Sequence, residues 1–218
     1  MKKGKYAVVL FDFDGTIVDS SEGIYNGLRY AFRAHQKPIP SDAILKKFIG
    51  PPLIDSFREF MGYDDALSYA MIDSYRVYYN ETGWKEVRVY AGIESLLATL
   101  HEQGIKLGTA STKPALFVER ILEHIGLLSY FDHIGGTDFS ETPQTKAEII
   151  ADGMQKLGGT VQNTLMVGDR KFDIDGAKEA GLPVAAVLYG FGNRAEFLAH
   201  HATYIAETVE DLKTQILN

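Results

Sequence analysis

The sequence predicts an α/β protein whose core is a Rossmann-like open parallel sheet, with an all-helical domain inserted after the first strand. From about residue 85 onward, short apolar runs alternate with helical segments, which is the pattern of βαβ units. Between residues 20 and 83, in contrast, apolar residues recur only at helical spacing. We therefore expect residues 1–18 and 85–218 to form the core and residues 19–84 to form the helical domain.

The composition limits the possible classes of protein. The chain has 218 residues, of which 45% are hydrophobic, which is enough for a sizeable core. It has no Cys, which excludes a disulfide scaffold, a thiol nucleophile and a Cys-ligated metal site. A net charge of −7 argues against nucleic acids and anionic membranes as partners. The apolar run before Asp12 is too short for a signal peptide or a membrane span, so we expect a cytoplasmic monomer or small homo-oligomer.

The first strand is predicted from the run Tyr-Ala-Val-Val-Leu-Phe at residues 6–11. A continuous run of β-branched and aromatic residues is typical of a strand that is buried on both faces. The run ends in the polar sequence Asp12-Phe13-Asp14-Gly15-Thr16.

The inserted domain is predicted to contain four helices. The first begins at Ser21, a suitable N-cap, and continues with apolar residues at helical spacing. The others are expected after Pro40-Ser41, around residues 53–61 and from residue 64 to residue 78. Ile49-Gly50-Pro51-Pro52 separates the second helix from the third, because Gly and Pro interrupt helices.

The rest of the core is predicted to alternate between strands and helices. Strands are expected at residues 105–110, near 133–135, and at 164–167, 184–188 and 203–205. Helices are expected at residues 93–103, 114–125, 146–157, 173–180 and from about residue 209. Glycines that end helices support three of these boundaries, at Gly104, Gly126 and Gly181.

Polar side chains follow the predicted strands at the edge where ligands bind in open parallel sheets. The first strand leads to Asp12 and Asp14, the strand at 105–110 leads to Ser111, and the strand at 164–167 leads to Asp169, with Asp173 one helical turn further. Three or four carboxylates about 5 Å apart would repel one another by several kcal/mol unless a cation were present. Oxygen ligands without Cys favour a hard divalent ion, and a small number of protein ligands favours Mg²⁺.

Four short motifs, in this order, resemble those of the haloacid dehalogenase-like hydrolase superfamily. They are Asp12-Phe13-Asp14-Gly15-Thr16, Ser111 after an apolar strand, Lys146 at the start of a helix, and Gly168-Asp169-x-x-x-Asp173. The inserted domain resembles the helical cap of the phosphoglycolate-phosphatase-like branch. Residues 48–53 and 166–170 also resemble that branch and its 5′-nucleotidase-like neighbours. The sequence departs from the pattern of this superfamily at two positions. Ser111 stands where Thr is more common, and Lys146 is not followed by the Pro that is frequent there.

The resemblance implies a Mg²⁺-dependent phosphomonoesterase that acts on a small phosphorylated metabolite, phosphoglycolate or a similar ester, through an aspartyl-phosphate. It implies that Asp12 is the nucleophile and that Asp14 is the general acid and base. The implied ligands of Mg²⁺ are Asp12, the backbone carbonyl of Asp14, Asp169 and, less directly, Asp173. The implied phosphate-binding residues are Ser111, Thr112 and Lys146.

Selection of the substrate is expected to depend on the inserted domain. The motifs contact only the phosphate, the metal ion and the proton, which all candidate substrates share. We expect the leaving group to be contacted by a loop formed by Gly50, Pro51, Pro52 and Leu53, because paired Pro fixes its shape and Gly permits close approach. The alternative is that this stretch only separates two helices.

Other interpretations of the same residues stay open. Asp12 and Asp14 could be turn residues, and Asp169 and Asp173 could be acids at a helix N-terminus. Ser111 could cap a helix, and Lys146 could be an exposed helix lysine. We expect Lys113, Arg170 and Lys171 to be surface charges and residues 190–192 to be a plain turn. The alternative functions are a 5′-nucleotidase, an inorganic pyrophosphatase and a phosphomutase of the same fold. A non-catalytic regulator fits four intact motifs least well.

Overall fold

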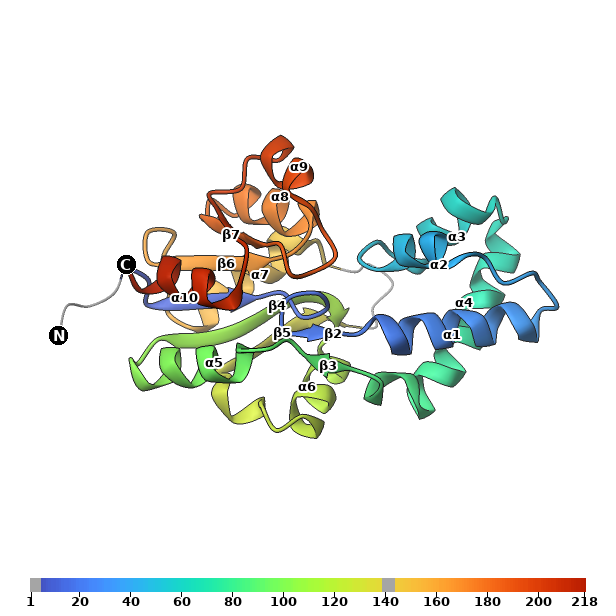
Figure 1. The fold of residues 1–218 in the computed structure, drawn as a ribbon, viewed down its shortest axis with the longest axis horizontal. Coiled ribbons are helices and arrows are strands. Elements are labelled where there is room, and N and C mark those ends of the chain that lie inside the picture. Colours follow the sequence, from blue (N-terminus) through green and yellow to red (C-terminus); the bar gives the residue numbers. More distant parts are fainter. Residues whose placement is uncertain (1–4, 139–143) are drawn as a thin grey trace. The chain divides into compact units, whose positions relative to one another are not determined.

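The computed structural model describes residues 5–138 and 144–218 of the chain (Figure 1). The chain forms two compact units, of which the first comprises residues 1–18 and 89–218 and the second comprises residues 19–88. The first unit contains a six-stranded sheet, and the second is helical. The predicted α/β class, with a parallel sheet and a helical insert after the first strand, is confirmed.

The sheet of the first unit has the strand order β5-β4-β1-β6-β7-β8, and its strands pair in parallel. The strands are β1 (Val8–Phe11), β4 (Lys106–Pro114), β5 (His133–Thr137), β6 (Thr164–Gly168), β7 (Val184–Val187) and β8 (Tyr204–Ala206). Every residue of β1, β6 and β7 is buried. Neighbouring residues of a strand point to opposite faces, so both faces of the sheet are covered, which explains the continuous apolar runs in the sequence.

Helices of the first unit provide this cover. They are α5 (Ile93–Glu102), α6 (Ala115–His124), α7 (Lys146–Lys156), α8 (Lys171–Glu179), α9 (Arg194–Ala199) and α10 (Val209–Leu217), together with the 3₁₀ turn Leu128–Tyr130. Helix α7 packs against α8, and α5 packs against α10. Leu10 of β1 and Met166 of β6 belong to the same apolar cluster as Ile149 of α7 and Ile174 of α8. This cluster fixes α7 and α8, which carry two of the site residues described below.

The second unit consists of four helices (blue to teal in Figure 1). They are α1 (Ser21–Ala34), α2 (Asp42–Leu45), α3 (Leu53–Met61) and α4 (Asp65–Glu81), with 3₁₀ turns at Lys46–Phe48 and Gly83–Lys85. Aromatic contacts hold it together: the ring of Phe57 meets that of Phe48 edge-on at 5.1 Å and stacks on that of Tyr63 at 6.2 Å. Among the residues that the structure describes, no helix is both long and apolar enough to span a bilayer.

The register of the sheet brings the ends of three strands to one edge. Phe11, the last residue of β1, is level with Thr109 of β4 and with Val167 of β6. The backbone N–H of Asp12 donates to the carbonyl of Val167 at 2.8 Å, so the chain is still tied to β6 as it leaves the sheet. The residues that follow these positions therefore meet at the carboxyl edge, as expected for a ligand site in an open α/β sheet.

The structure differs from the sequence expectation at short or irregular elements. The sequence did not predict the two-residue strands β2 (Val18–Asp19) and β3 (Arg88–Val89), which pair with each other. It also did not predict helix α9, which has six residues. Such elements are too short to show a periodicity. Strand β4 does not end at Ala110 but continues to Pro114, so Ser111 lies within the strand. The register between β4 and β5 shifts between these two positions, and this irregularity carries the strand past its expected end.

Candidate active site

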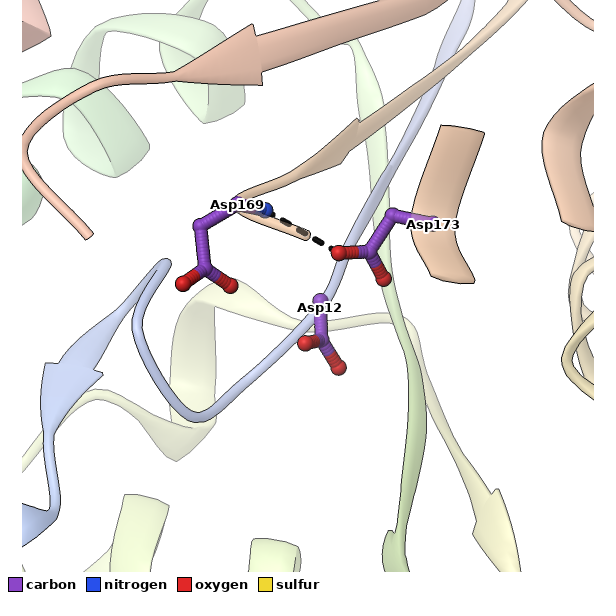
Figure 2. A group of neighbouring side chains, drawn as sticks. All are labelled: Asp12, Asp169 and Asp173. Carbon is purple, nitrogen blue, oxygen red and sulfur yellow. Dashed lines mark hydrogen bonds between the residues drawn. The ribbon is translucent and has the colours of Figure 1, made fainter. Parts of the chain in front are cut away.

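Three aspartates converge at the carboxyl edge of the sheet (Figure 2). Asp12 follows β1, Asp169 follows β6, and Asp173 lies in the first turn of α8. Each offers one carboxylate oxygen, and these oxygens lie within 4.8 Å of one another. Asp169 and Asp173 are 0% and 1% exposed, and the side chain of Asp12 is 13% exposed. The sequence prediction that these three carboxylates meet is therefore correct in geometry.

Asp169 is held by the loops around it. Its Oδ2 accepts the backbone N–H of Phe191 at 2.7 Å, and its Oδ1 lies 3.4 Å from the Thr16 hydroxyl, near the limit for a hydrogen bond. Gly15 and Gly190 approach the same carboxyl group so closely that a Cβ on either would collide with Asp169. Gly15 also has a φ of 85°, which side chains rarely adopt. Both glycines are therefore needed to close the backbone around Asp169.

Asp173 fixes the backbone that carries Asp169. Its Oδ2 accepts the N–H of Asp169 at 3.0 Å, the bond drawn in Figure 2, and the N–H of Arg170 at 2.9 Å. These donors lie at the start of α8, where free N–H groups and the helix dipole favour a carboxylate. A Cβ at Gly168 would collide with the Asp173 carboxyl, so the Gly of this motif is required by space.

Lys146 places a positive charge between two of these aspartates. Its Nζ lies 2.8 Å from Asp12 Oδ1 and 2.7 Å from Asp173 Oδ1, and its side chain is 8% exposed. It is the first residue of α7, which is capped by reciprocal hydrogen bonds between Thr145 and Glu148. Burial alone would lower the pKa of Lys146, but the two carboxylates outweigh it and raise that pKa. Lys146 therefore stays charged, and the alternative of an exposed helix lysine is wrong.

The carboxylates of this cluster resist ionisation because they are buried together. Burial raises the pKa of Asp12, Lys146 opposes this, and Asp173 adds to it. Burial raises the pKa of Asp169 well above its usual range, and Asp173 and Asp12 raise it further. Although Lys146 pairs with Asp12 Oδ1, this buried oxygen accepts no well-aligned hydrogen bond from the described part of the chain. A hard divalent cation fits such a site, because it binds carboxylate oxygens and offsets their repulsion.

Asp14 and Lys113 form a separate ion pair. Lys113 Nζ donates to both carboxylate oxygens of Asp14, at 3.0 and 3.2 Å. The side chains are 8% exposed for Lys113 and 19% exposed for Asp14. The prediction that Lys113 is a surface charge is therefore wrong. The side chain of Asp14 lies outside the three-aspartate cluster. The family resemblance implied its backbone carbonyl as the metal ligand, and that role stays a prediction.

The other predicted phosphate-binding residues lie on the irregular end of β4. Ser111 is 2% exposed, and its Oγ accepts the backbone N–H of Lys113 at 3.3 Å. Thr112 is exposed, and its carbonyl accepts the hydroxyl of Thr137 at 3.1 Å. The phosphate-binding roles of Ser111 and Thr112 stay predictions.

The predicted specificity loop belongs to the second unit. Gly50 has a φ of 106°, Pro51 and Pro52 follow it, and α3 begins at Leu53. Its contact with a leaving group stays a prediction.

The loop after β7 is the part of the site that the sequence interpretation missed. We expected residues 190–192 to be a plain turn, but the N–H of Phe191 binds Asp169, and Gly190 lies against Gly15 and Asp169. The available signal was positional: this loop follows a core strand at the same edge as the aspartates. Next to it, Glu196 accepts both the Arg170 side chain at 3.1 Å and the Lys171 N–H at 2.6 Å. With 21% of its side chain exposed, Arg170 is thus partly buried rather than a free surface charge.

The model of the family described as "Haloacid dehalogenase-like hydrolase" matches residues 9–187 of the chain. The chain belongs to this family. The match contains all three aspartates of the cluster and Lys146, so the resemblance predicted from four short motifs is confirmed.

The proteins that are similar to this chain carry several names. A 5′-nucleotidase of Pseudomonas aeruginosa is 34% identical over 96% of this chain and 95% of its own. Tyrosine-protein kinase PtkA of Mycobacterium tuberculosis is 32% identical over 94% of this chain and 71% of its own, and pyrophosphatase PpaX of Halalkalibacterium halodurans is 34% identical over 94% of both. A crystal structure described as a predicted phosphatase from Clostridium acetobutylicum has a TM-score of 0.91 and 39% identity, over 97% of this hydrolase and 98% of that chain.

Proposed function

We propose that this hydrolase is a Mg²⁺-dependent phosphomonoesterase that cleaves a small phosphate ester through an aspartyl-phosphate on Asp12. One observation carries the proposal: Asp12 shares a buried cluster with Asp169 and Asp173, and Lys146 pairs with it directly. The cluster offers a nucleophile, a cation site and a fixed positive charge within one small volume. Phosphate-monoester hydrolysis is among the slowest uncatalysed reactions, so it needs such concentrated charge stabilisation.

The cation site would be formed by Asp12 and Asp169, with the carbonyl of Asp14. An ion bound there would supply positive charge that offsets the repulsion between the attacking carboxylate and the anionic phosphoryl group. Asp173 would support the cation site less directly, because its two oxygens already bind backbone N–H groups and Lys146. It keeps Asp169 and Lys146 in place.

In this proposal, the Asp12 carboxylate attacks the phosphorus atom in line with the leaving oxygen. Its backbone is fixed by the hydrogen bond to β6, and Lys146 holds its carboxylate at 2.8 Å. An O–P bond forms to Asp12 as the bond from phosphorus to the leaving oxygen breaks. Lys146 and the Ser111 hydroxyl stabilise the equatorial oxygens of the phosphoryl group, where charge gathers in the transition state.

Asp14 handles the proton in both steps. In the first step it donates a proton to the leaving oxygen. In the second step it accepts a proton from the water that attacks the phosphoenzyme, which releases phosphate and restores Asp12. Asp14 suits this role because it lies two residues from the nucleophile and its carboxylate is not occupied by the three-aspartate cluster.

The helical unit is proposed to act as a cap that contacts the leaving group. The sequence bounds assign the core to residues 1–18 and 85–218 and the cap to residues 19–84, whereas the second compact unit comprises residues 19–88. Residues 50–53 are the proposed specificity loop, because Gly50 and the two prolines give it a defined shape. A cap over the site would exclude bulk water during phosphoryl transfer.

The similar proteins rank the substrates to be tested. The similarity to a 5′-nucleotidase over nearly the whole chain supports nucleoside 5′-monophosphates first, and the similarity to PpaX supports pyrophosphate as a second candidate. Phosphoglycolate and small sugar phosphates follow from the resemblance to the phosphoglycolate-phosphatase-like branch. The kinase named among the relatives adds transfer to a tyrosine hydroxyl as an alternative fate of the phosphoryl group.

A phosphate-release screen tests this proposal. The panel contains nucleoside monophosphates, pyrophosphate, phosphoglycolate, sugar phosphates and p-nitrophenyl phosphate, each measured with Mg²⁺ and with excess chelator. We expect release from at least one monoester that disappears with chelator and returns with Mg²⁺. Release that is insensitive to the chelator, or none from any ester, contradicts the proposal. A parallel incubation with a tyrosine peptide separates hydrolysis from transfer.

A further inference from the structure

We propose that Lys113 is a positioning residue that holds the Asp14 carboxylate in the orientation needed for proton transfer. The inference rests on the proposed function, because it assumes that Asp14 is the acid and base. Its basis is the contact of Lys113 Nζ with both oxygens of Asp14, at 3.0 and 3.2 Å. A contact to both oxygens restrains the rotation of the carboxylate as well as its position.

Burial makes this contact different from a surface ion pair. The side chain of Lys113 is 8% exposed and that of Asp14 is 19% exposed. At the other end of the same strand, Lys106 pairs with Asp132 at 2.6 Å, but its side chain is 58% exposed. Water can hydrate the charges of the Lys106–Asp132 pair, so loss of that pair costs little free energy. Loss of Lys113, in contrast, would leave the poorly solvated Asp14 carboxylate without this partner.

The backbone of Lys113 ties the same pair to the predicted phosphate site. Its N–H donates to Ser111 Oγ at 3.3 Å, so one residue contacts both Asp14 and Ser111. Lys113 lies in the irregular end of β4, between Ala110 and Pro114, where the register with β5 shifts. The irregular strand end therefore brings the lysine to the loop that carries Asp14.

An acid that is misplaced by about 1 Å can lose a factor of ~10² in rate, because proton transfer requires hydrogen-bond distance. Removal of the Lys113 side chain should therefore lower the rate through its effect on Asp14. The size of this decrease should depend on how strongly the leaving group requires protonation. Glycerol 2-phosphate has an alkoxide leaving group that needs one, whereas p-nitrophenolate leaves without help. The substrate dependence of kcat/KM separates this role from a structural one, because kcat/KM includes leaving-group departure but not the later hydrolysis of the phosphoenzyme.

The test compares Lys113→Met, Asp14→Asn and the double variant, with Lys106→Met as the matched control on the same strand. We expect Lys113→Met to lower kcat/KM by about 10- to 100-fold on glycerol 2-phosphate and far less on p-nitrophenyl phosphate. In the Asp14→Asn background, the same change should have almost no further effect, since it acts through Asp14. Lys113→Arg should recover most of the loss, and Lys106→Met should resemble the wild type.

Three results would overturn the inference. They are an equal loss on both substrates, a full further loss in the Asp14→Asn background, and wild-type values for Lys113→Met. The first two point to direct binding of the phosphate or to general damage. If Lys113→Met does not fold, Lys113→Gln is measured against the same expectations. If the wild type hydrolyses neither ester, the proposed function fails; if it does and the variants show no substrate dependence, only this inference fails.

Discussion

Asp173 accepts the backbone N–H of Asp169 at 3.0 Å, so one carboxylate of the cluster fixes the main chain that presents another (Figure 2). Oδ2 of Asp173 accepts this N–H and the backbone N–H of Arg170, and Oδ1 of Asp173 pairs with the Lys146 ammonium. Asp173 therefore links the start of α8 to the start of α7. Its principal role in this account is to hold Asp169 and Lys146 in place.

Replacing Asp173 should weaken metal binding as well as catalysis. We expect Asp173→Ala to raise the Mg²⁺ concentration for half-maximal activity by about 10- to 100-fold, because the backbone of Asp169 loses its acceptor. The matched control is Asp175→Ala on the same helix, whose side chain is 53% exposed and pairs with His200. An unchanged Mg²⁺ dependence in Asp173→Ala would mean that Asp169 is fixed by other contacts.

Stability without metal should fall as the pH rises through the acid range. Burial raises the pKa of Asp169 and of Asp12 above the value of 3.8 for an exposed aspartate. In the pH window above 3.8, the folded protein therefore holds protons that the unfolded chain has released, and its free energy of unfolding decreases with rising pH.

Added Mg²⁺ competes with these protons, so the rise in Tm that it causes should grow between about pH 5 and about pH 8. The measurement is Tm with Mg²⁺ minus Tm with chelator at each pH. In Asp169→Asn, this difference should be small at every pH. A difference that shrinks with rising pH in the wild type contradicts the account.

Gly190→Ala should disable the site without unfolding the protein. A Cβ at this position would collide with the carbonyl of Gly15 and with Asp169, so the loop must move away from the carboxylate that it holds. We expect activity to fall by ~10²-fold or more, as is typical when a positioned group is displaced. The control is Gly104→Ala, where a Cβ meets open space and only the positive φ of 74° opposes the change. That variant should lose some stability but keep its kcat.

The specificity loop and the phosphate site should respond differently to substitution. Leu53→Ala is expected to change the order of substrates ranked by kcat/KM. Ser111→Ala should lower kcat/KM for all substrates together, by about 10²- to 10³-fold if its hydroxyl acts as one electrostatic donor. The full phosphoester panel measures both variants. Equal losses on every substrate from Leu53→Ala would place specificity elsewhere in the second unit.

The sequence predicted the elements that have a clear pattern of apolar residues, either a helical period or a continuous run. The run at residues 6–11 gave β1 because a strand buried on both faces is apolar throughout, and Asp12, Asp169 and Asp173 follow from the carboxyl ends of parallel strands. The order of the motifs predicted Lys146 at a helix start, and Lys146 is the first residue of α7. These features depend on local chemistry, which the sequence contains.

Features that depend on three-dimensional contacts were not predictable in the same way. The burial of Lys113 follows from an irregular strand end that brings it to Asp14, 99 positions away in the sequence. The contact of Phe191 with Asp169 uses a backbone N–H, which any residue could supply, so no side-chain pattern marks it. The strands β2 and β3 have two residues each and show no alternation.

The central claim is that Asp12 becomes phosphorylated during turnover. Asp14→Asn should keep the nucleophile but hydrolyse the phosphoenzyme slowly, so acid quenching during turnover of p-nitrophenyl phosphate with Mg²⁺ should trap it. Mass spectrometry should then find one phosphoryl group on the peptide that contains Asp12, and none in a folded Asp12→Asn variant, which should also lack turnover. Phosphate on Ser111 or on any other residue, or covalent labelling that persists in Asp12→Asn, would contradict the claim.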